Sequence, residues 1–260
     1  MLTALTIAGS DPSGGAGIQA DLKTFHQFNV FGTSVLTLLT AQNTVGVRSV
    51  HCLEPSFVLE QLEAVLDDVP PAAIKTGALG RAAIVNAVGE RLAETGQPLV
   101  VDPVMISKHG HRLVEHEVID AYRDTLLERA TLITPNLYEA EALTGCSIAS
   151  VEDMEEAARR LAQLGAHAVV IKGGALTGDP VDVLWWNETP TRLPGPRHET
   201  TQTHGTGCAF SAAITALLAR GVALRDAVKG AKAFIGRAIE SAPHLGAGRG
   251  PINLHARTTQ

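Results

Sequence analysis

Residues 5–11 read Leu-Thr-Ile-Ala-Gly-Ser-Asp, a short apolar run that stops at a glycine and a carboxylate. Apolar runs without polar alternation, rich in Val, Ile and Leu, are typical of strands buried on both faces, and hence of a parallel sheet. Four more runs stop in the same abrupt way: 72–74 before Lys75, 99–101 before Asp102, 132–133 before Thr134-Pro135-Asn136, and 168–171 before Lys172.

Helical patterns separate these runs and supply the crossovers of repeated β-α units. The clearest of them cover 57–66, 82–93, 151–164 and 224–239. The alternation predicts an α/β fold, a three-layer α/β/α sandwich with a mainly parallel central sheet.

Two regions break the alternation. Residues 33–42 and 48–53 predict extra strands, and 181–186 with 191–193 predict a hairpin near a sheet edge. Adjacent strand residues face opposite sides, so at most one of Trp185 and Trp186 could stack on a ligand, and ordinary edge packing is the alternative.

Length and composition favour a single domain over residues 1–255 with a short tail at 256–260. The net charge is −6 and there is no basic run, so neither nucleic acid nor a membrane surface is an expected partner. The three cysteines are far apart and share no CxxC spacing, which argues against disulfides and predicts a reducing compartment. Without a basic leader or a long apolar run, we expect a soluble, cytoplasmic protein.

Polar residues stand where the predicted strands end. Ligands of open α/β sheets bind outside the carboxyl ends of the strands. We therefore expect a set of polar side chains from distant segments to converge on one rim: Asp11, Lys75, Asp102, Asn136 and Lys172.

A glycine-punctuated turn at 203–208, Thr-His-Gly-Thr-Gly-Cys, leads directly into the apolar helical pattern of 209–220. Glycines let backbone N–H groups approach an anion, and a helix start adds the positive end of its dipole. A thiol at such a place ionises more easily than a free cysteine, which makes Cys208 a candidate base or nucleophile. The alternative is that Cys208 is a small buried hydrophobe.

The corner at 9–17, Gly-Ser-Asp-Pro-Ser-Gly-Gly-Ala-Gly, opens a helix that carries Gln19, Asp21 and Lys23. It is neither a Walker loop nor a complete GxGxxG motif. Asp21 is a candidate substrate contact, and the alternative is a solvated carboxylate in the first helical turns.

Asp102, Asn136 and Glu139 offer oxygen ligands, which fits the sparse demand of magnesium for one or two carboxylates plus substrate phosphates. The alternative is that Asp102 caps a turn and Glu139 lies exposed on a helix. Lys172 precedes two glycines, which favours a phosphate counter-charge over a snorkelling surface lysine.

His109, His111 and His116 lack partners at zinc-site spacing, so we expect a loop over the site rather than a metal cluster. No GxSxG elbow and no HExxH motif occurs, which disfavours serine hydrolases and metalloproteases.

Five segments together resemble the hydroxymethylpyrimidine and phosphomethylpyrimidine kinases of thiamine biosynthesis, members of the ribokinase-like superfamily. The segments are 8–21, Ala41-Gln42-Asn43, 102–105, 134–136 and 203–208, and the resemblance spans nearly the whole chain. Most of that superfamily has an aspartate base at the last position of the glycine turn. Cys208 at that position is itself typical of the pyrimidine kinases and their pyridoxal-kinase relatives.

The resemblance implies two successive ATP-dependent phosphorylations, of 4-amino-5-hydroxymethyl-2-methylpyrimidine and then of its monophosphate, by a homodimeric enzyme. It implies a substrate pocket of Gly9, Asp21, Gln42, Ala78 and Val104. It further implies that Lys172, Asn136 and Thr203 bind ATP, that Asp102 and Glu139 hold Mg²⁺ directly or through water, and that Gly205, Thr206, Gly207 and Cys208 face the transferred phosphoryl group. Whether Cys208 is the base or only a nearby thiolate stays open.

The chain departs from this family at Ala78, where methionine is common, and in the loop 107–111. Both departures concern substrate range. The rival functions are pyridoxal kinase, which acts on a similar primary alcohol, and a vitamin-binding module without catalysis.

Overall fold

The computed structural model describes residues 1–105 and 114–258, so the loop predicted at 107–111 lies outside the described residues. The chain divides into two compact units. Unit 1 comprises Met1–Leu79 and His198–Gln260, and unit 2 comprises Gly80–Arg197. The prediction of one domain over 1–255 stays a prediction.

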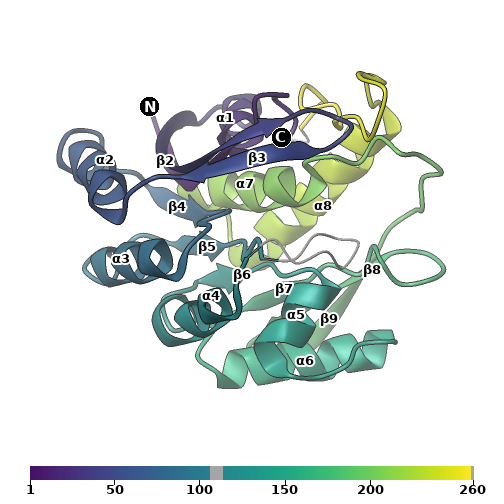
Figure 1. Ribbon diagram of the computed structural model, residues 1–260. Helices are drawn as coiled ribbons and strands as arrows, with labels where there is room; N and C mark the ends of the chain where they lie inside the picture. The colour runs from purple at the N-terminus through teal and green to yellow at the C-terminus, as the bar shows by residue number, and fades with distance from the viewer. Residues whose placement is uncertain (106–113, 259–260) are drawn as a thin grey trace. The chain divides into compact units, whose positions relative to one another are not determined.

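The sheet of unit 1 has the order β3-β2-β1-β4 (Figure 1). Its strands are β1 (Thr3–Ser10), β2 (Phe31–Gln42), β3 (Val47–Cys52) and β4 (Ala73–Thr76). β1 pairs in parallel with β2 and β4, whereas β3 pairs antiparallel with β2 at the edge. The predicted strands are confirmed with one correction: Lys75 lies inside β4 and not after it, opposite Thr6 of β1.

Four helices complete unit 1: α1 (Gly17–Gln27), α2 (Pro55–Asp68), α7 (Thr206–Ala219) and α8 (Leu224–Glu240). α1 packs on β1, β2 and α7, and α7 also packs on β4 and α8. α7 is buried almost all round, as its uniformly apolar sequence predicts. Phe28 and Phe234 meet edge to face, with ring centroids 5.2 Å apart.

Unit 2 carries strands in the order β5-β6-β7-β8-β9 (Figure 1). These are β5 (Leu99–Val101), β6 (Leu132–Ile133), β7 (Val169–Ile171), β8 (Val181–Trp186) and β9 (Thr189–Pro194). β6 pairs in parallel with β5 and β7, and β7-β8-β9 are antiparallel, so the predicted hairpin is confirmed.

The helices of unit 2 are α3 (Ala82–Leu92), α4 (His116–Ala121), α5 (Leu137–Thr144) and α6 (Val151–Gln163), with a π-helical segment at Tyr122–Leu126. α5 and α6 both begin with capping boxes, Asn136 with Glu139 and Ser150 with Asp153. These side chains fix where each helix starts.

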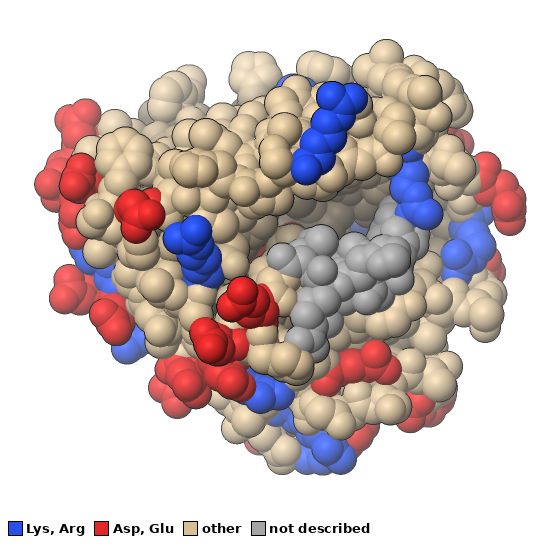
Figure 2. All heavy atoms as spheres, viewed as in Figure 1, with Lys and Arg blue, Asp and Glu red and all other residues tan. Residues whose placement is uncertain are grey.

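Among the residues described, no helix is both long and apolar enough to cross a bilayer. Figure 2 shows Lys and Arg side chains scattered over the drawn face, some beside Asp or Glu and some, near the top, among uncharged residues.

Candidate functional site

The start of α7 has the geometry that the turn at 203–208 predicts. Gly205 is the residue before the helix and has a φ of 77°, in the left-handed region that glycine adopts without strain. The backbone of Gly205 packs directly against the Gly15–Ala16 segment, so the two glycine-rich turns of unit 1 lie in contact. The Thr206 hydroxyl donates to the Thr203 carbonyl oxygen at 2.8 Å and stabilises the turn.

Cys208 lies in the first turn of α7 and is half-buried, whereas the next nine residues, 209–217, are all buried. Cys208 is less enclosed than the packing alternative would favour, and its role in the site stays a prediction. A half-buried thiol at a helix start is close to the backbone N–H groups that a first turn presents to an anion.

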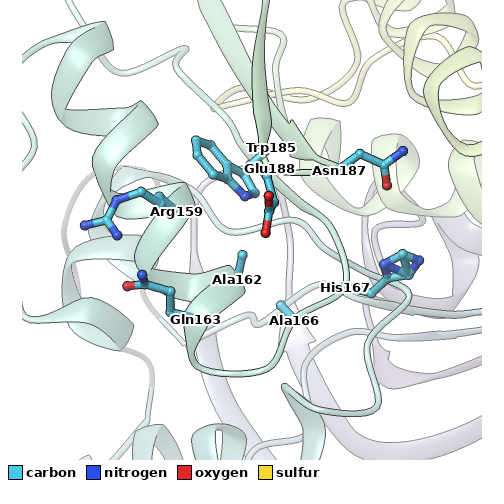
Figure 3. A pocket seen from close by; sticks show the side chains of 8 residues that line it. All are labelled: Arg159, Ala162, Gln163, Ala166, His167, Trp185, Asn187 and Glu188. Atoms are coloured by element: carbon cyan, nitrogen blue, oxygen red, sulfur yellow. The ribbon is translucent and has the colours of Figure 1, made fainter.

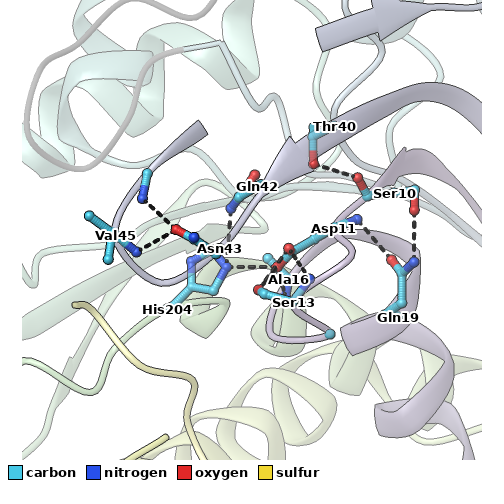
Figure 4. A network of polar contacts seen from close by, with 12 residues as sticks. Ser10, Asp11, Ser13, Ala16, Gln19, Thr40, Gln42, Asn43, Val45 and His204 are labelled. Atoms are coloured by element: carbon cyan, nitrogen blue, oxygen red, sulfur yellow. Dashed lines mark hydrogen bonds and ion pairs between the residues drawn. The ribbon is translucent and has the colours of Figure 1, made fainter. Parts of the chain in front are cut away.

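A polar network joins the two glycine-rich turns to β2 (Figure 4). His204 Nε2 lies 2.7 Å from Asp11 Oδ2 and 3.3 Å from Gln42 Nε2. Burial by itself would raise the pKa of the Asp11 carboxyl, but the hydrogen bonds from His204 and Ser13 outweigh it and lower the pKa to about 2. Asp11 is therefore an anion under all ordinary conditions.

Asp11 also shapes its own loop. Its carboxylate accepts from the backbone N–H groups of Ser13 and Ala16, both at 2.9 Å, and from the Ser13 hydroxyl. Gln19 of α1 accepts from the Asp11 backbone N–H at 2.9 Å (Figure 4). The loop before α1 is thus held by one buried carboxylate.

Asp21 and Lys75 form an ion pair in the interior of unit 1. Lys75 Nζ lies 2.8 Å from Asp21 Oδ2, and both side chains are 0% exposed. The Thr6 hydroxyl donates to the same Asp21 oxygen at 2.6 Å. The alternative of a solvated Asp21 is therefore wrong, and the predicted substrate contact of Asp21 stays a prediction.

The remaining predicted pocket residues are small or half-buried. Gly9 is enclosed, and a β-carbon there would lie 2.5 Å from Leu38 Cδ1. Ala78 is half-buried, and its carbonyl oxygen accepts from the Thr37 hydroxyl at 2.6 Å. Val104 belongs to unit 2 and is half-buried.

Asp102 and Lys172 form the centre of a second polar group, in unit 2. Lys172 Nζ lies 2.9 Å from Asp102 Oδ1, and the Thr134 hydroxyl donates to the same oxygen at 3.3 Å. The Asp102 side chain is 2% exposed and that of Lys172 is 19% exposed. Lys172 is therefore not a snorkelling surface lysine, and its ammonium offsets the charge of a buried carboxylate.

Glu139 lies beside this pair and is also buried, so the alternative of an exposed helical carboxylate is wrong. Its oxygens accept from the N–H groups of Asn136 at 2.8 Å and Met105 at 3.3 Å. Burial raises the pKa of Glu139 to about 7, and the Asp102 charge adds to this, although Lys172 acts in the opposite direction. Burial also raises the pKa of Tyr122.

The polar group around Asp102 and Glu139 does not form a complete set of protein ligands for Mg²⁺. Within 1–105 and 114–258, no three His, Cys, Asp or Glu side chains form a metal-binding cluster. The oxygens of Glu139 already accept backbone N–H groups, and Asp102 Oδ1 accepts from Lys172. These residues suit an ion held mainly by substrate phosphates and water, which is the usual habit of Mg²⁺.

The structure brings the predicted site residues together in two groups. Asp102, Asn136, Glu139 and Lys172 meet in unit 2, where a bridge pairs Asn136 with Lys172. The turn at 203–208 meets the 9–17 corner and Gln42 in unit 1. Convergence of both groups on one rim stays a prediction.

Sequence reasoning placed Asp11 among the rim residues but gave it no role, and it assigned no role to His204 or Thr134. The available signal was position: Asp11 and Thr134 follow apolar runs, and His204 lies next to the first glycine of the turn. His204 and Asp11 are 193 positions apart, so their contact required the fold.

Trp185 lines a separate hollow of about 480 Å³ in unit 2 (Figure 3). It follows from the strand geometry that Trp186 faces the other side, so only one tryptophan reaches this hollow. Residues of α6, of the connection from α6 to β7 and of the β8-β9 turn complete the lining: Arg159, Ala162, Gln163, Ala166, His167, Asn187 and Glu188. No predicted site residue is among them.

A mainly parallel α/β fold with a glycine turn at a helix start is typical of phosphate-binding enzymes of the kinase class. Comparison with known proteins makes this specific. Residues 11–253 match the phosphomethylpyrimidine kinase family, and the chain therefore belongs to that family.

Curated relatives carry the same family name. The chain is 44% identical to the hydroxymethylpyrimidine/phosphomethylpyrimidine kinase of Bacillus subtilis over 97% of this chain and 94% of that protein. It is 48% identical to the thiamine biosynthesis bifunctional protein ThiED of Geobacter sulfurreducens over 96% of this chain, which spans 51% of that longer protein.

Solved structures confirm the α/β fold. An ADP complex of Bacillus subtilis pyridoxal kinase superposes with a TM-score of 0.90 at 41% identity, covering 98% of each chain. The phosphomethylpyrimidine kinase of Clostridium difficile superposes with a TM-score of 0.83 at 42% identity, covering 92% of this chain and all of that one.

Proposed function

We propose that this protein transfers the γ-phosphoryl group of ATP to the hydroxymethyl oxygen of 4-amino-5-hydroxymethyl-2-methylpyrimidine and then to the resulting monophosphate, in thiamine biosynthesis. The family match over residues 11–253 carries the proposal. The half-buried Cys208 at the glycine-led start of α7 supports it, because that is where a phosphoryl group would be stabilised.

In the proposed reaction the protein mainly positions groups and stabilises charge, as phosphoryl transfer requires. The substrate hydroxyl attacks the γ-phosphorus, its proton leaves, and ADP departs. The backbone of 205–208 faces the equatorial oxygens, and the Cys208 thiolate takes the proton or holds the hydroxyl near it. Gln42 and the main chain at Gly9 orient the pyrimidine ring.

Lys172, Asn136 and Thr203 are assigned to ATP, with Lys172 beside the phosphates. A lysine already 2.9 Å from a buried carboxylate is positioned before the nucleotide arrives. Asp102 and Glu139 would hold Mg²⁺ directly or through water, and the ion would supply charge neutralisation for the phosphates. In support, a solved Staphylococcus aureus pyridoxal kinase, 38% identical, is in complex with AMP-PCP and pyridoxal.

That structure also makes pyridoxal kinase the second candidate, since relatives of this fold at about 40% identity bear that name. Half-buried Ala78 favours a wider substrate range, because its short side chain fills less of a pocket than the methionine common in the family. A binding module without catalysis is disfavoured, because a pure binder has no need of Cys208, Lys172 and Asp102 together.

A coupled assay tests the proposal. Purified protein is supplied with ATP, Mg²⁺ and the aminopyrimidine, and mono- and diphosphate products are followed by mass. Successive formation of both products is expected. Turnover of pyridoxal with none of the aminopyrimidine would favour the second candidate, and ligand binding without ATP consumption would favour the binding module.

We also propose a homodimer in a reducing cytosol. Val45 in the turn between β2 and β3 and Val47 and Val50 of β3 expose apolar side chains at this edge of the sheet, which supports a partner surface there. Cys52, Cys146 and Cys208 are thiols rather than halves of disulfides, as is usual for proteins of a reducing compartment. Light scattering of the purified protein measures the oligomeric state directly.

A further inference from the structure

The contact between His204 and its two neighbours fixes where one proton lies. His204 Nε2 is 2.7 Å from Asp11 Oδ2, a distance that requires a hydrogen atom between the two. Asp11 is an anion at ordinary pH, so the hydrogen belongs to the imidazole. Nε2 of His204 is therefore a donor, in the neutral and in the charged ring alike.

The same nitrogen lies 3.3 Å from the end of the Gln42 amide. An amide NH₂ only donates and an amide oxygen only accepts, and the two can exchange places by a half-turn of the group. Because Nε2 of His204 is itself a donor, the stable arrangement presents Gln42 Oε1 to His204. The Gln42 NH₂ group then points away from the ring.

The ring that imposes this orientation is firmly held. The His204 backbone N–H donates to the Gly250 carbonyl oxygen at 3.0 Å, and the His204 carbonyl oxygen accepts from the Ile252 backbone N–H at 3.3 Å. A β-carbon on Gly15 would lie 2.7 Å from His204 Cδ2, so the ring edge rests on the first glycine-rich turn. All these residues belong to unit 1.

We propose that Asp11 and His204 are positioning residues that lock the Gln42 amide with its NH₂ toward the substrate. Gln42 then reads a hydrogen-bond acceptor on the heteroaromatic ring, such as an unprotonated ring nitrogen, and discriminates against a ring that offers a donor there. This refines the expectation that Gln42 could donate and accept, and it rests on the proposed function for the identity of the ligand.

Two substitutions separate this role from a structural one. Gln42→Glu keeps an oxygen for His204 but has no NH₂, so the KM for the aminopyrimidine should rise roughly ten- to a hundredfold while the KM for ATP changes little. His204→Gln places an amide nitrogen with two hydrogens near the position of Nε2, so it can donate to both Asp11 and Gln42. The KM of His204→Gln for the aminopyrimidine should therefore lie close to that of the wild type, whereas the KM of His204→Ala should be raised.

The control is His26→Gln, an exposed histidine on α1, which should match the wild type in both KM values. A Gln42→Glu enzyme with an unchanged KM for the aminopyrimidine would overturn the proposal, because Gln42 would then be read through its oxygen. The proposal would also be overturned if His204→Gln were as impaired as His204→Ala, because a hydrogen-bond donor at position 204 would then not account for the role of His204.

NMR spectroscopy can show whether Nε2 of His204 carries a proton, independently of any enzymatic assay. In protein labelled with ¹⁵N-histidine, the His204 signal, assigned by its loss in His204→Gln, should show a protonated Nε2. A bare Nε2 would overturn the proposal even in an active enzyme. A wild type that phosphorylates no aminopyrimidine would instead refute the proposed function, and the state of Nε2 would still decide the orientation of Gln42.

Discussion

The carbonyl oxygen of Gly15 occupies the space beside Gly205, only 1.7 Å from where a β-carbon on Gly205 would stand. The two glycine-rich turns, distant in sequence, therefore depend on each other. Any side chain at Gly205 would force them apart, and the start of α7 would move away from the Asp11 loop.

Gly205→Ala should lower both stability and turnover. The positive φ alone costs alanine about 1 to 3 kcal/mol, and the contact with Gly15 adds to this. Thermal unfolding should show a fall in Tm, and kcat should fall further than stability explains, since the turn faces the phosphoryl group. Gly96→Ala, where nothing lies within 4 Å of the added carbon, serves as the control and should leave both unchanged.

Cys208→Ala should leave aminopyrimidine binding measurable but reduce kcat by roughly two to four orders of magnitude, the usual contribution of a positioned base. Binding by calorimetry and turnover by the coupled assay are measured side by side. Cys52→Ala and Cys146→Ala, which replace the other two half-buried thiols, should retain normal kcat. Near-normal turnover of Cys208→Ala would remove Cys208 from the mechanism.

Lys75→Met should destabilise the protein strongly. It leaves the Asp21 carboxylate without its ammonium partner in a fully buried place, and breaking such a pair costs about 3 to 5 kcal/mol. The double variant Asp21→Asn with Lys75→Met removes both charges and should recover part of that loss. Urea unfolding of the two single variants and the double variant measures the interaction free energy between Asp21 and Lys75. If the losses of unfolding free energy of the two single variants simply added up in the double variant, the ion pair would not be stabilising.

The sequence predicts the fold well because its signals are local. Apolar runs such as 99–101 and the helical pattern at 151–164 need only periodicity, and each has its element in the structure. The site is less predictable. The enclosure of Asp21 depends on β4 bringing Lys75 opposite Thr6, and the burial of Glu139 depends on its contact with Met105, 34 positions away. No local pattern contains those long-range contacts.

Ala78→Met tests the departure from the family. A methionine sulfur against an aromatic ring contributes about 0.3 to 1.5 kcal/mol, so the KM for the aminopyrimidine should fall up to roughly tenfold. The KM for pyridoxal, measured in the same preparations, should not fall in parallel if Ala78 widens the pocket for bulkier rings. Equal effects on both substrates would show that position 78 does not set substrate range.

Asp11→Asn should change the pH dependence of the free energy of unfolding. The native pKa of Asp11 is about 2, below its ordinary value of 3.8, so the unfolded chain takes up this proton first as the pH falls. The stabilisation from Asp11 is therefore complete above about pH 4 and is lost as the pH falls toward 2.

In urea unfolding at a series of pH values, Asp11→Asn should be less stable than the wild type at pH 7 by about 2 kcal/mol, and the difference should shrink toward pH 2. Asp67→Asn, at an exposed position of α2, should follow the wild-type curve. A gap between Asp11→Asn and the wild type that stays constant from pH 7 to pH 2 would mean that the ionised carboxylate does not hold the loop and His204.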